Sequence, residues 1–294
     1  MTILQAIFLG LVQGLTEFIP VSSTAHLVFA SRLVGLYADA ADKTLQAEQT
    51  TATIAVIQLG TLLAVLIYFA RDIVNILRAF IEDHTAWFRG RSEPGGPKLS
   101  KNAWLGWLII IGSLPVGTIG LALKKLIEGP FTKNLWVIAT MMIVVGILLL
   151  IAEIIGKRER DMDQLRVTDA LAVGSAQVLA LIPGSSRSGS TIMGGLFAGL
   201  TRETAARFSF LLSIPAIAAS GLLELKEAVA KLPPGSYGAL AVATIVAGIV
   251  GYASIWFLLR YLRTHSTSLF IVYRVIVGVA ILAALSAGYV SASI

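Results

Sequence analysis

The sequence is most informative in what it has little of, which is cysteine and charge. None of the 294 residues is cysteine, and this excludes a disulfide framework, a thiolate metal site and thiol chemistry. Only 14% of the residues are charged, whereas soluble domains carry roughly 25%. Since 56% are hydrophobic and the apolar runs are long, the composition predicts an all-α polytopic membrane protein.

The net charge of +6 does not indicate a nucleic-acid partner. The basic residues lie in short segments between apolar runs, where they anchor loops on the cytoplasmic face of a membrane. No Lys or Arg precedes Arg32, so the N-terminus lacks the basic region of a signal peptide. We therefore expect residues 1–16 to belong to the mature structure.

Six apolar runs approach the ~20 residues that cross a bilayer. They are Thr51–Ala70, Asn102–Leu123, Asn134–Ala152, Phe208–Leu223, Leu232–Leu259 and Val275–Ile294. The fourth run spans if Arg207 snorkels to the interface. The last run spans if it begins near Leu269, which draws Arg274 into the apolar zone.

Four further runs are too short to span, and they form two pairs. Glu17 interrupts the first pair and Arg187 the second, and Pro and Ser break each pair at its centre. Half-length helices joined by a polar turn predict re-entrant helical hairpins, at 3–34 and 168–202. Two kinked full spans are the alternative, because irregular backbone at membrane depth must be buried in protein or line a cavity.

The two hairpins carry nearly the same motif. Gln13–His26 reads QGLTEFIPVSSTAH, and Gln177–Gly189 reads QVLALIPGSSRSG. A repeated, polar, Pro-broken segment in a membrane protein indicates a buried site. We therefore predict a single membrane domain, 1–294, with a first repeat at 1–155 and a second at 156–294.

Loop charge orients the two repeats. With the N-terminus outside, the inside segments hold twelve Lys and Arg residues and the outside segments seven, which favours this orientation. The inside segments are 71–101, 156–168 and 260–268, and the outside segments are 1–50, 124–134 and 224–236. The first hairpin then enters from outside and the second from inside, as an inverted-topology repeat. Residues 82–101, with the sequence EPGGP at 93–97, are expected to form a flexible connector.

Hydroxyl groups follow both prolines at the expected helix starts. They belong to Ser22, Ser23 and Thr24 in the first copy and to Ser185, Ser186 and Ser188 in the second. Serine at a helix start caps free backbone N–H groups, and the same groups also bind anions. Two such turns facing each other would enclose a phosphate or diphosphate.

Arg187 and Glu17 are ionisable groups close to these turns. An intramembrane Arg is costly unless paired, and its planar fork suits a phosphoryl group, although an ion pair with Glu17 is the alternative. Glu17 follows Gln13 by four residues, so both share a helix face. Its carboxylate is a candidate ligand for Mg²⁺ or Ca²⁺, a candidate base, or the partner of Arg187. Gln177 is the second-copy counterpart of Gln13.

His26 is the only histidine in an apolar segment, and it follows Ser23 by three residues. On a helix both side chains point the same way, so the imidazole is a candidate general base or nucleophile. A satisfied core histidine is the alternative. Arg274, in the last span, either supports the site or snorkels to the interface.

These segments resemble a known family. Gly14–His26 and Pro183–Gly189 look like the two signatures of the undecaprenyl-diphosphate phosphatase, or bacitracin-resistance, family. Shorter matches are Val56–Gly60, Phe208–Pro215 and Tyr273–Arg274, so that the resemblance covers essentially the whole chain.

The resemblance implies a multi-pass enzyme of the bacterial inner membrane. Such an enzyme removes the terminal phosphate of a C55 prenyl diphosphate, uses a divalent cation and forms dimers, and the loop charges place its site on the periplasmic side. By motif match the active-site residues are Glu17, Ser22, Ser23, Thr24, His26, Ser186 and Arg187. Many members carry Glu in place of Gln13, and a neutral amide binds a cation more weakly.

A lipid-phosphate flippase is the alternative from another class, since inverted repeats, broken helices and a midplane anion site are transporter architecture. It would need the same Arg and Ser groups but no nucleophile. The proximity of His26, Ser23 and Glu17 favours an enzyme, with Arg187 clamping the diphosphate and the prenyl tail leaving sideways into lipid. The pattern leaves open whether Ser23 or His26 attacks the phosphorus.

Overall fold

The computed structural model describes residues 1–40, 42–89, 99–123, 134–233 and 235–292, and every regular element within these ranges is a helix. The elements are α1 (Ile3–Phe18), α2 (Ser23–Leu33), α3 (Lys43–Tyr68), α4 (Ala70–Phe88), α5 (Lys101–Ala122), α7 (Leu135–Ile155), η2 (Met162–Gln164), α8 (Val167–Val178), η3 (Leu179–Leu181), α9 (Arg187–Phe197), α10 (Arg202–Lys231), α11 (Tyr237–Leu262) and α12 (Ser268–Ser286).

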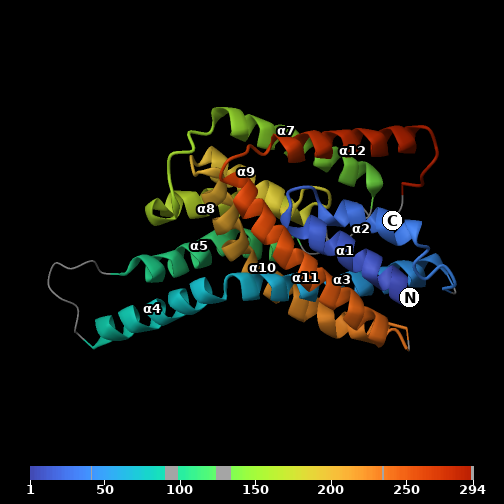
Figure 1. The fold of residues 1–294 in the computed structure, drawn as a ribbon, viewed down its shortest axis with the longest axis horizontal. Helices are drawn as coiled ribbons and strands as arrows, with labels where there is room; N and C mark the ends of the chain where they lie inside the picture. Colours follow the sequence, from blue (N-terminus) through green and yellow to red (C-terminus); the bar gives the residue numbers. More distant parts are fainter. Residues whose placement is uncertain (41, 90–98, 124–133, 234, 293–294) are drawn as a thin grey trace.

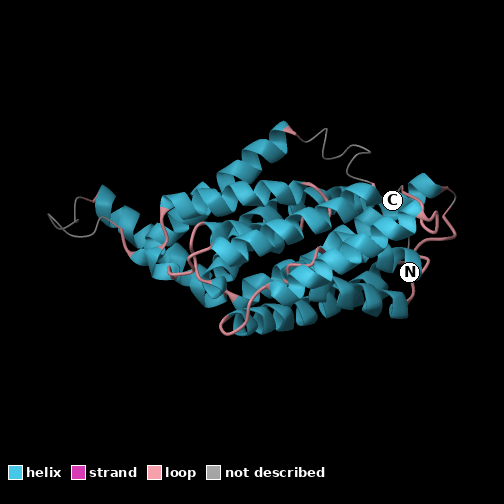
Figure 2. Ribbon diagram, turned by 90° about the horizontal axis from the view of Figure 1, so that it is seen from above, coloured by secondary structure: helices cyan, strands magenta, loops and turns pink. Residues whose placement is uncertain are grey.

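Five helices in the described part of the chain are long and apolar enough to cross a bilayer. They are α3 from Thr44, α5, α7, α11 and α12. They match five of the six expected spans, and the chain is therefore a polytopic membrane protein. The sixth expected span, Phe208–Leu223, lies inside the 30-residue helix α10. Both chain ends lie at the same end of the bundle (Figures 1 and 2).

The segment after α3 is helical where the sequence analysis expects a loop. Ile76 and Phe80 recur at helical spacing and pack over Gly106 of α5. The charged residues that suggest a loop lie on the exposed face, where Arg78 donates to Glu82 at 2.7 Å. Residues 82–88 of the expected connector thus belong to α4, and its EPGGP sequence lies outside the described residues. Figure 1 shows α4 projecting from one end of the bundle.

Two pairs of short helices surround the Pro-Ser-Ser motifs. α1 packs on α2, and α8, extended by η3, packs on α9. α1 also packs extensively against α11, where a Cβ added at Gly14 would lie 2.7 Å from Cβ of Val250. Likewise α8 packs against α5, where a Cβ at Gly174 would lie 2.1 Å from the carbonyl oxygen of Gly112. Glycine thus brings each pair close to a long helix.

The two helix pairs are closed at their bases by different contacts. Arg160 donates to both carboxylate oxygens of Asp169 at 2.5 and 2.7 Å, and also to the carbonyl oxygen of Ala198 at the end of α9. The hydrogen bonds to Asp169 raise the pKa of Arg160 above its ordinary value. The contact that closes the first pair is uncharged, because Gln5 Nε2 donates to the carbonyl oxygen of Val34 at 2.8 Å.

Candidate active site

An open pocket of about 210 Å³ lies where the two Pro-Ser-Ser turns meet. Its polar lining combines both hairpins with α3, and consists of Gln13, Glu17, Ser23, Thr24, Gln58, Ser186 and Arg187. Its apolar lining includes Leu27, Val28, Ile54, Ala180 and Ile182. Two segments far apart in the sequence therefore share one pocket that is lined by both polar and apolar side chains.

Both turns end on a serine with positive φ. Ser22, at φ 79°, precedes α2, and Ser186, at φ 66°, precedes α9. This backbone region favours glycine, and other residues there carry strain of about 1–3 kcal/mol that clusters at functional sites. Ser186 Oγ caps α9 by accepting a hydrogen bond from the Gly189 N–H at 3.1 Å. The strain therefore occurs at equivalent places in the two copies.

The two turns are offset by one residue relative to their sequence motifs. The motifs align Ser23 with Ser186, but the helix starts pair Ser22 with Ser186 and Ser23 with Arg187. From its proline to its helix start the second turn is one residue longer, and it contains Gly184, whose φ is 94° and whose added Cβ would lie 2.2 Å from a carbonyl oxygen of α7. Ser23 and Arg187 consequently occupy the first helical position of α2 and α9.

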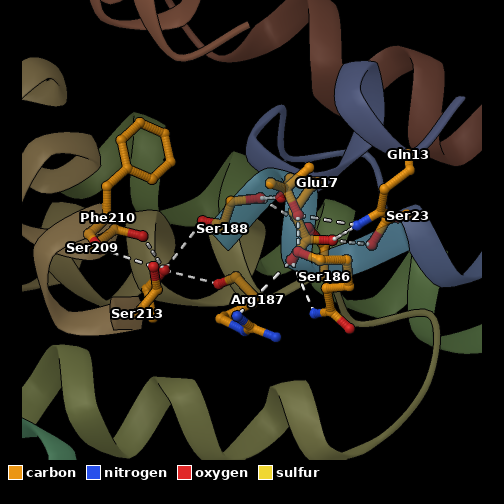
Figure 3. A network of polar contacts seen from close by, with 12 residues as sticks. Gln13, Glu17, Ser23, Ser186, Arg187, Ser188, Ser209, Phe210 and Ser213 are labelled. Carbon is orange, nitrogen blue, oxygen red and sulfur yellow. Dashed lines mark hydrogen bonds and ion pairs between the residues drawn. The ribbon is translucent and has the colours of Figure 1, made fainter. Parts of the chain in front are cut away.

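Glu17 is the centre of the hydrogen-bond network in the pocket (Figure 3). Its Oε2 accepts from Ser23 Oγ at 2.8 Å and from Gln13 Nε2 at 3.1 Å. Its Oε1 accepts from Gln58 Nε2 at 3.4 Å and lies 3.8 Å from Arg187 Nη1. Within the described residues, Glu17 is therefore the base in contact with the Ser23 hydroxyl.

Both ring nitrogens of His26 are engaged by groups other than the Ser23 hydroxyl. Nδ1 lies 2.7 Å from the carbonyl oxygen of Ser22, and Nε2 lies 2.6 Å from the hydroxyl of Tyr273. A carbonyl oxygen can only accept, so Nδ1 carries the proton and Nε2 accepts from Tyr273. The imidazole and phenol rings are stacked, with centroids 5.6 Å apart. The arrangement connects His26 to the backbone of the first turn.

The remaining candidates lie around or behind the pocket. Ser188 Oγ lies 3.4 Å from the carbonyl oxygen of Glu17 and 3.3 Å from that of Ile19, and so joins the two hairpins. Ser22 and Ser185 are buried behind the pocket lining. Arg274 is fully buried and donates to backbone carbonyls of both turns. Gln177 is also buried.

Buried polar atoms without a hydrogen-bond partner concentrate in the two hairpins. Among the described residues they belong to Gln13, Ser22, Gln177, Ser185, Arg187 and Ser190. Native interiors leave few such atoms unpaired, so each one requires an explanation. Gln13 and Arg187 line the pocket, where a polar ligand would supply their missing partners.

The oxygen atoms beside Glu17 fit a divalent cation that is shared with a ligand. The described residues contain no group of three or more His, Cys, Asp or Glu side chains that could hold a metal alone. Mg²⁺, however, is usually held by one or two carboxylates together with substrate phosphates and waters, and amide oxygens also ligate Ca²⁺. The Glu17 carboxylate and the unpaired Oε1 of Gln13 are oxygen atoms of the kind that such a cation would need.

Three contacts of the site were not identified from the sequence. Gln58 and Thr61 reach the network from α3, where Gln13 Nε2 donates to Thr61 Oγ1 at 3.3 Å. The signal for Gln58 is an amide in the middle of an apolar run. Tyr273 and His26 are 247 positions apart, and no local pattern relates them.

The chain is similar to known proteins along nearly its whole length. The family described as "Bacitracin resistance protein BacA" matches residues 6–280. An undecaprenyl-diphosphatase of Syntrophobacter fumaroxidans is 52% identical over 282 residues, covering 96% of this chain and 97% of the relative. A protein of the same name from Myxococcus xanthus is 48% identical over 293 residues, covering 99% and 92%. Because the family match covers nearly the whole chain, the protein belongs to the bacitracin resistance protein BacA family.

Proposed function

We propose that this protein removes the terminal phosphate of undecaprenyl diphosphate and releases undecaprenyl phosphate, the lipid carrier of cell-wall synthesis. Relatives that carry the name of this activity match along nearly their whole length. The structural observation that carries the proposal is the Ser23 hydroxyl donating to Glu17 beside Arg187. A hydrolase needs such a base-activated nucleophile and a flippase does not, so this contact favours the phosphatase.

In this mechanism Ser23 is the nucleophile and Glu17 is its base. Glu17 Oε2 takes the hydroxyl proton while Ser23 Oγ attacks the terminal phosphorus. The bond from that phosphorus to the bridging oxygen breaks, and undecaprenyl phosphate leaves as an anion. Water then attacks the phosphoserine, its proton passes to the phosphate, and Glu17 returns its own proton to Ser23 Oγ.

Arg187 and the two helix starts would stabilise the transferred phosphoryl group. The planar guanidinium suits two phosphate oxygens at once. Thr24, Ser186 and the free N–H groups at the starts of α2 and α9 supply further donors. A divalent cation held by Glu17 and Gln13 would add positive charge against the diphosphate. His26 acts here as a positioning residue, because both of its nitrogens are engaged elsewhere.

The apolar lining of the pocket suits the lipid part of this substrate. Leu27, Val28 and Ile54 line the same pocket as Arg187, so the first prenyl units would contact them while the diphosphate contacts Arg187. The rest of a C55 tail exceeds the pocket and would leave between helices into the membrane.

We infer the finer architecture from the partners of the helices. α10 is the sixth span, both helix pairs are re-entrant, and residues 1–155 and 156–294 form the inverted repeat. Helix packing supports this, since α1 lies against α11 as α8 lies against α5. Similarly α2 contacts α12 as α9 contacts α7. α3 packs on α10, and α7 packs on α12. In both cases the two helices stand at equivalent places in the two repeats.

The pocket would face the periplasm in the inner membrane, because the loop-charge bias puts the first hairpin outside. The chain is free of cysteine, so single cysteines at Ala38 and at Thr85, both exposed, report orientation. An impermeant thiol reagent applied to spheroplasts should label the variant at Ala38 and spare the one at Thr85. The reverse pattern would invert the topology.

Phosphate release by the purified protein from undecaprenyl diphosphate, with and without chelator, tests the activity. We expect one phosphate per lipid, a loss of rate with chelator, and recovery with Mg²⁺ or Ca²⁺. Rapid quench with terminally labelled substrate should trap acid-stable phosphoserine at Ser23. An acid-labile phosphohistidine would move the attack to His26. Transfer of intact lipid between leaflets without phosphate release would favour the flippase.

A further inference from the structure

Arg274 is the largest fully buried side chain in the described structure, and it has no acidic partner there within 4 Å. A guanidinium at this depth is costly unless its donors are satisfied. Two of its hydrogen bonds reach α7, from Nε to the carbonyl oxygen of Met142 at 3.1 Å and from Nη2 to that of Met141 at 3.4 Å. All of its partners are backbone carbonyls.

The other hydrogen bonds of Arg274 reach both turns of the site. Nη1 donates to the carbonyl oxygen of Pro20 at 3.2 Å, and Nη2 donates to those of Gly184 and Ser185 at 3.0 Å each. Because the helices are broken at these turns, the carbonyls lack helical partners, and lipid cannot supply them. One guanidinium therefore satisfies the two turns and bridges them.

The position of this charge affects the donors that face the pocket. The carbonyl of Ser185 belongs to the same peptide unit as the N–H of Ser186, and in a trans peptide the two point in opposite directions. Ser186 lines the pocket, while Arg274 lies on the carbonyl side of this peptide. A positive charge there polarises the peptide and strengthens the N–H as a donor to an anion.

Tyr273, the preceding residue on α12, reaches the first turn by a second route. Its hydroxyl donates to His26 Nε2 at 2.6 Å, and His26 Nδ1–H donates to the carbonyl oxygen of Ser22 at 2.7 Å. Ser22 has positive φ, a conformation that surrounding contacts must hold in place. The pair Tyr273 and Arg274 thus contacts the backbone of both turns from one helix.

We propose that Tyr273 and Arg274 are positioning residues that hold the two turns in the arrangement in which Ser23 and Arg187 act on one phosphoryl group. This inference rests on the proposed phosphatase activity. Neither residue lines the pocket, so their loss should affect turnover more than substrate binding.

The first test is Arg274→Lys. This substitution keeps the positive charge, but a lysine ammonium cannot donate to both turns from two separate nitrogens as the guanidinium does. We expect kcat to fall about 100-fold, as for the loss of a transition-state donor, with KM within about threefold of wild type. Amide hydrogen exchange in peptides 20–33 and 183–197 should become faster. The control is Arg263→Lys, at an exposed pair with Glu203, which should change neither quantity.

The second test is Tyr273→Phe, which keeps the ring stack and removes only the hydroxyl. We expect kcat to fall about 10-fold, with faster exchange confined to peptide 20–33. Tyr237→Phe, at an exposed tyrosine, is the control. Should Arg274→Lys fail to fold, this variant decides the question. Wild-type turnover and exchange in folded variants would overturn the positioning role, whereas an inactive wild type would overturn the phosphatase proposal and leave the exchange test standing.

Discussion

The two turns carry different residues at the same structural position. The first position of α2 holds Ser23, hydrogen bonded to Glu17, and the first position of α9 holds Arg187. Both helices offer free N–H groups to an anion. The comparison shows how a duplicated motif can divide its work, since one copy supplies a hydroxyl with a base and the other supplies a fixed cation.

The contacts that close the open ends of the two hairpins also differ in charge. The second is closed by the charged contacts of Arg160 with Asp169 and Ala198, and the first by the neutral contact of Gln5 with Val34. Charge-assisted hydrogen bonds are about twice as strong as neutral ones. We therefore expect the half that carries Arg187 to be anchored more firmly than the half that carries Ser23.

The largest difference between the copies should appear when serine is removed from each turn. Ser23→Ala should lower the rate of phosphate release at least about 10⁴-fold, as expected for a lost nucleophile. Ser186→Ala should cost only about 10-fold, because other donors to the phosphate remain. Initial rates at saturating substrate measure both effects. Equal losses would contradict the proposal that the two copies have different roles in the reaction.

Glu17→Gln should have the next largest effect. An amide still hydrogen bonds to Ser23 but cannot take its proton, so the rate should fall about 10³-fold. Gln58→Ala, which removes a hydrogen bond to Glu17 without removing the base, is the matched control and should lose much less. A Glu17→Gln enzyme with more than a tenth of wild-type turnover would show that another group accepts the proton.

Arg187→Lys tests the second copy while keeping its charge. A point charge cannot reproduce two contacts to a phosphoryl group, so we expect about a 100-fold loss in kcat/KM. Arg202→Lys, at a structural contact with Glu153, serves as the control for exchanging Arg in this half. Near-full turnover of the Lys variant would reduce Arg187 to a counter-charge for Glu17.

The smallest expected effects concern stability at the hairpin bases. Asp169→Asn should lower the free energy of unfolding by about 2 kcal/mol, since it weakens buried hydrogen bonds to a charged group. Gln5→Ala should lower it by about 1 kcal/mol, because one neutral hydrogen bond is lost. Unfolding in detergent measures both changes. A larger loss of unfolding free energy for Gln5→Ala would show that the first hairpin is the more firmly anchored one.

Patterns that are local in the sequence predicted most of the fold. Five spans are visible as apolar runs, and the helix breaks at Pro20 and Pro183 follow from the missing proline donor. α4 was missed because a search for apolar runs treats Arg78 and Glu82 as loop residues. The helical spacing of Ile76 and Phe80 was the better signal.

The geometry of the site depended on information that the motifs do not contain. The second turn is one residue longer than the first, so that Arg187, rather than Ser186, corresponds to Ser23. His26 shares a helix face with Ser23, yet its ring is held by Tyr273 from α12. Such contacts arise from tertiary packing between distant segments, which local spacing cannot show.

The close packing of α1 on α11 has a consequence for the order in which the protein folds during its synthesis. Gly14 fits against Val250, and α11 is synthesised long after α1, so α1 can pack on its main partner only at a late stage of synthesis. The second hairpin, by contrast, packs α8 against α5, which precedes it in the chain and has already been made when α8 is synthesised. Contacts between distant segments form slowly. We therefore expect the hairpin that carries Ser23, although it is synthesised before the other hairpin, to complete its packing after it.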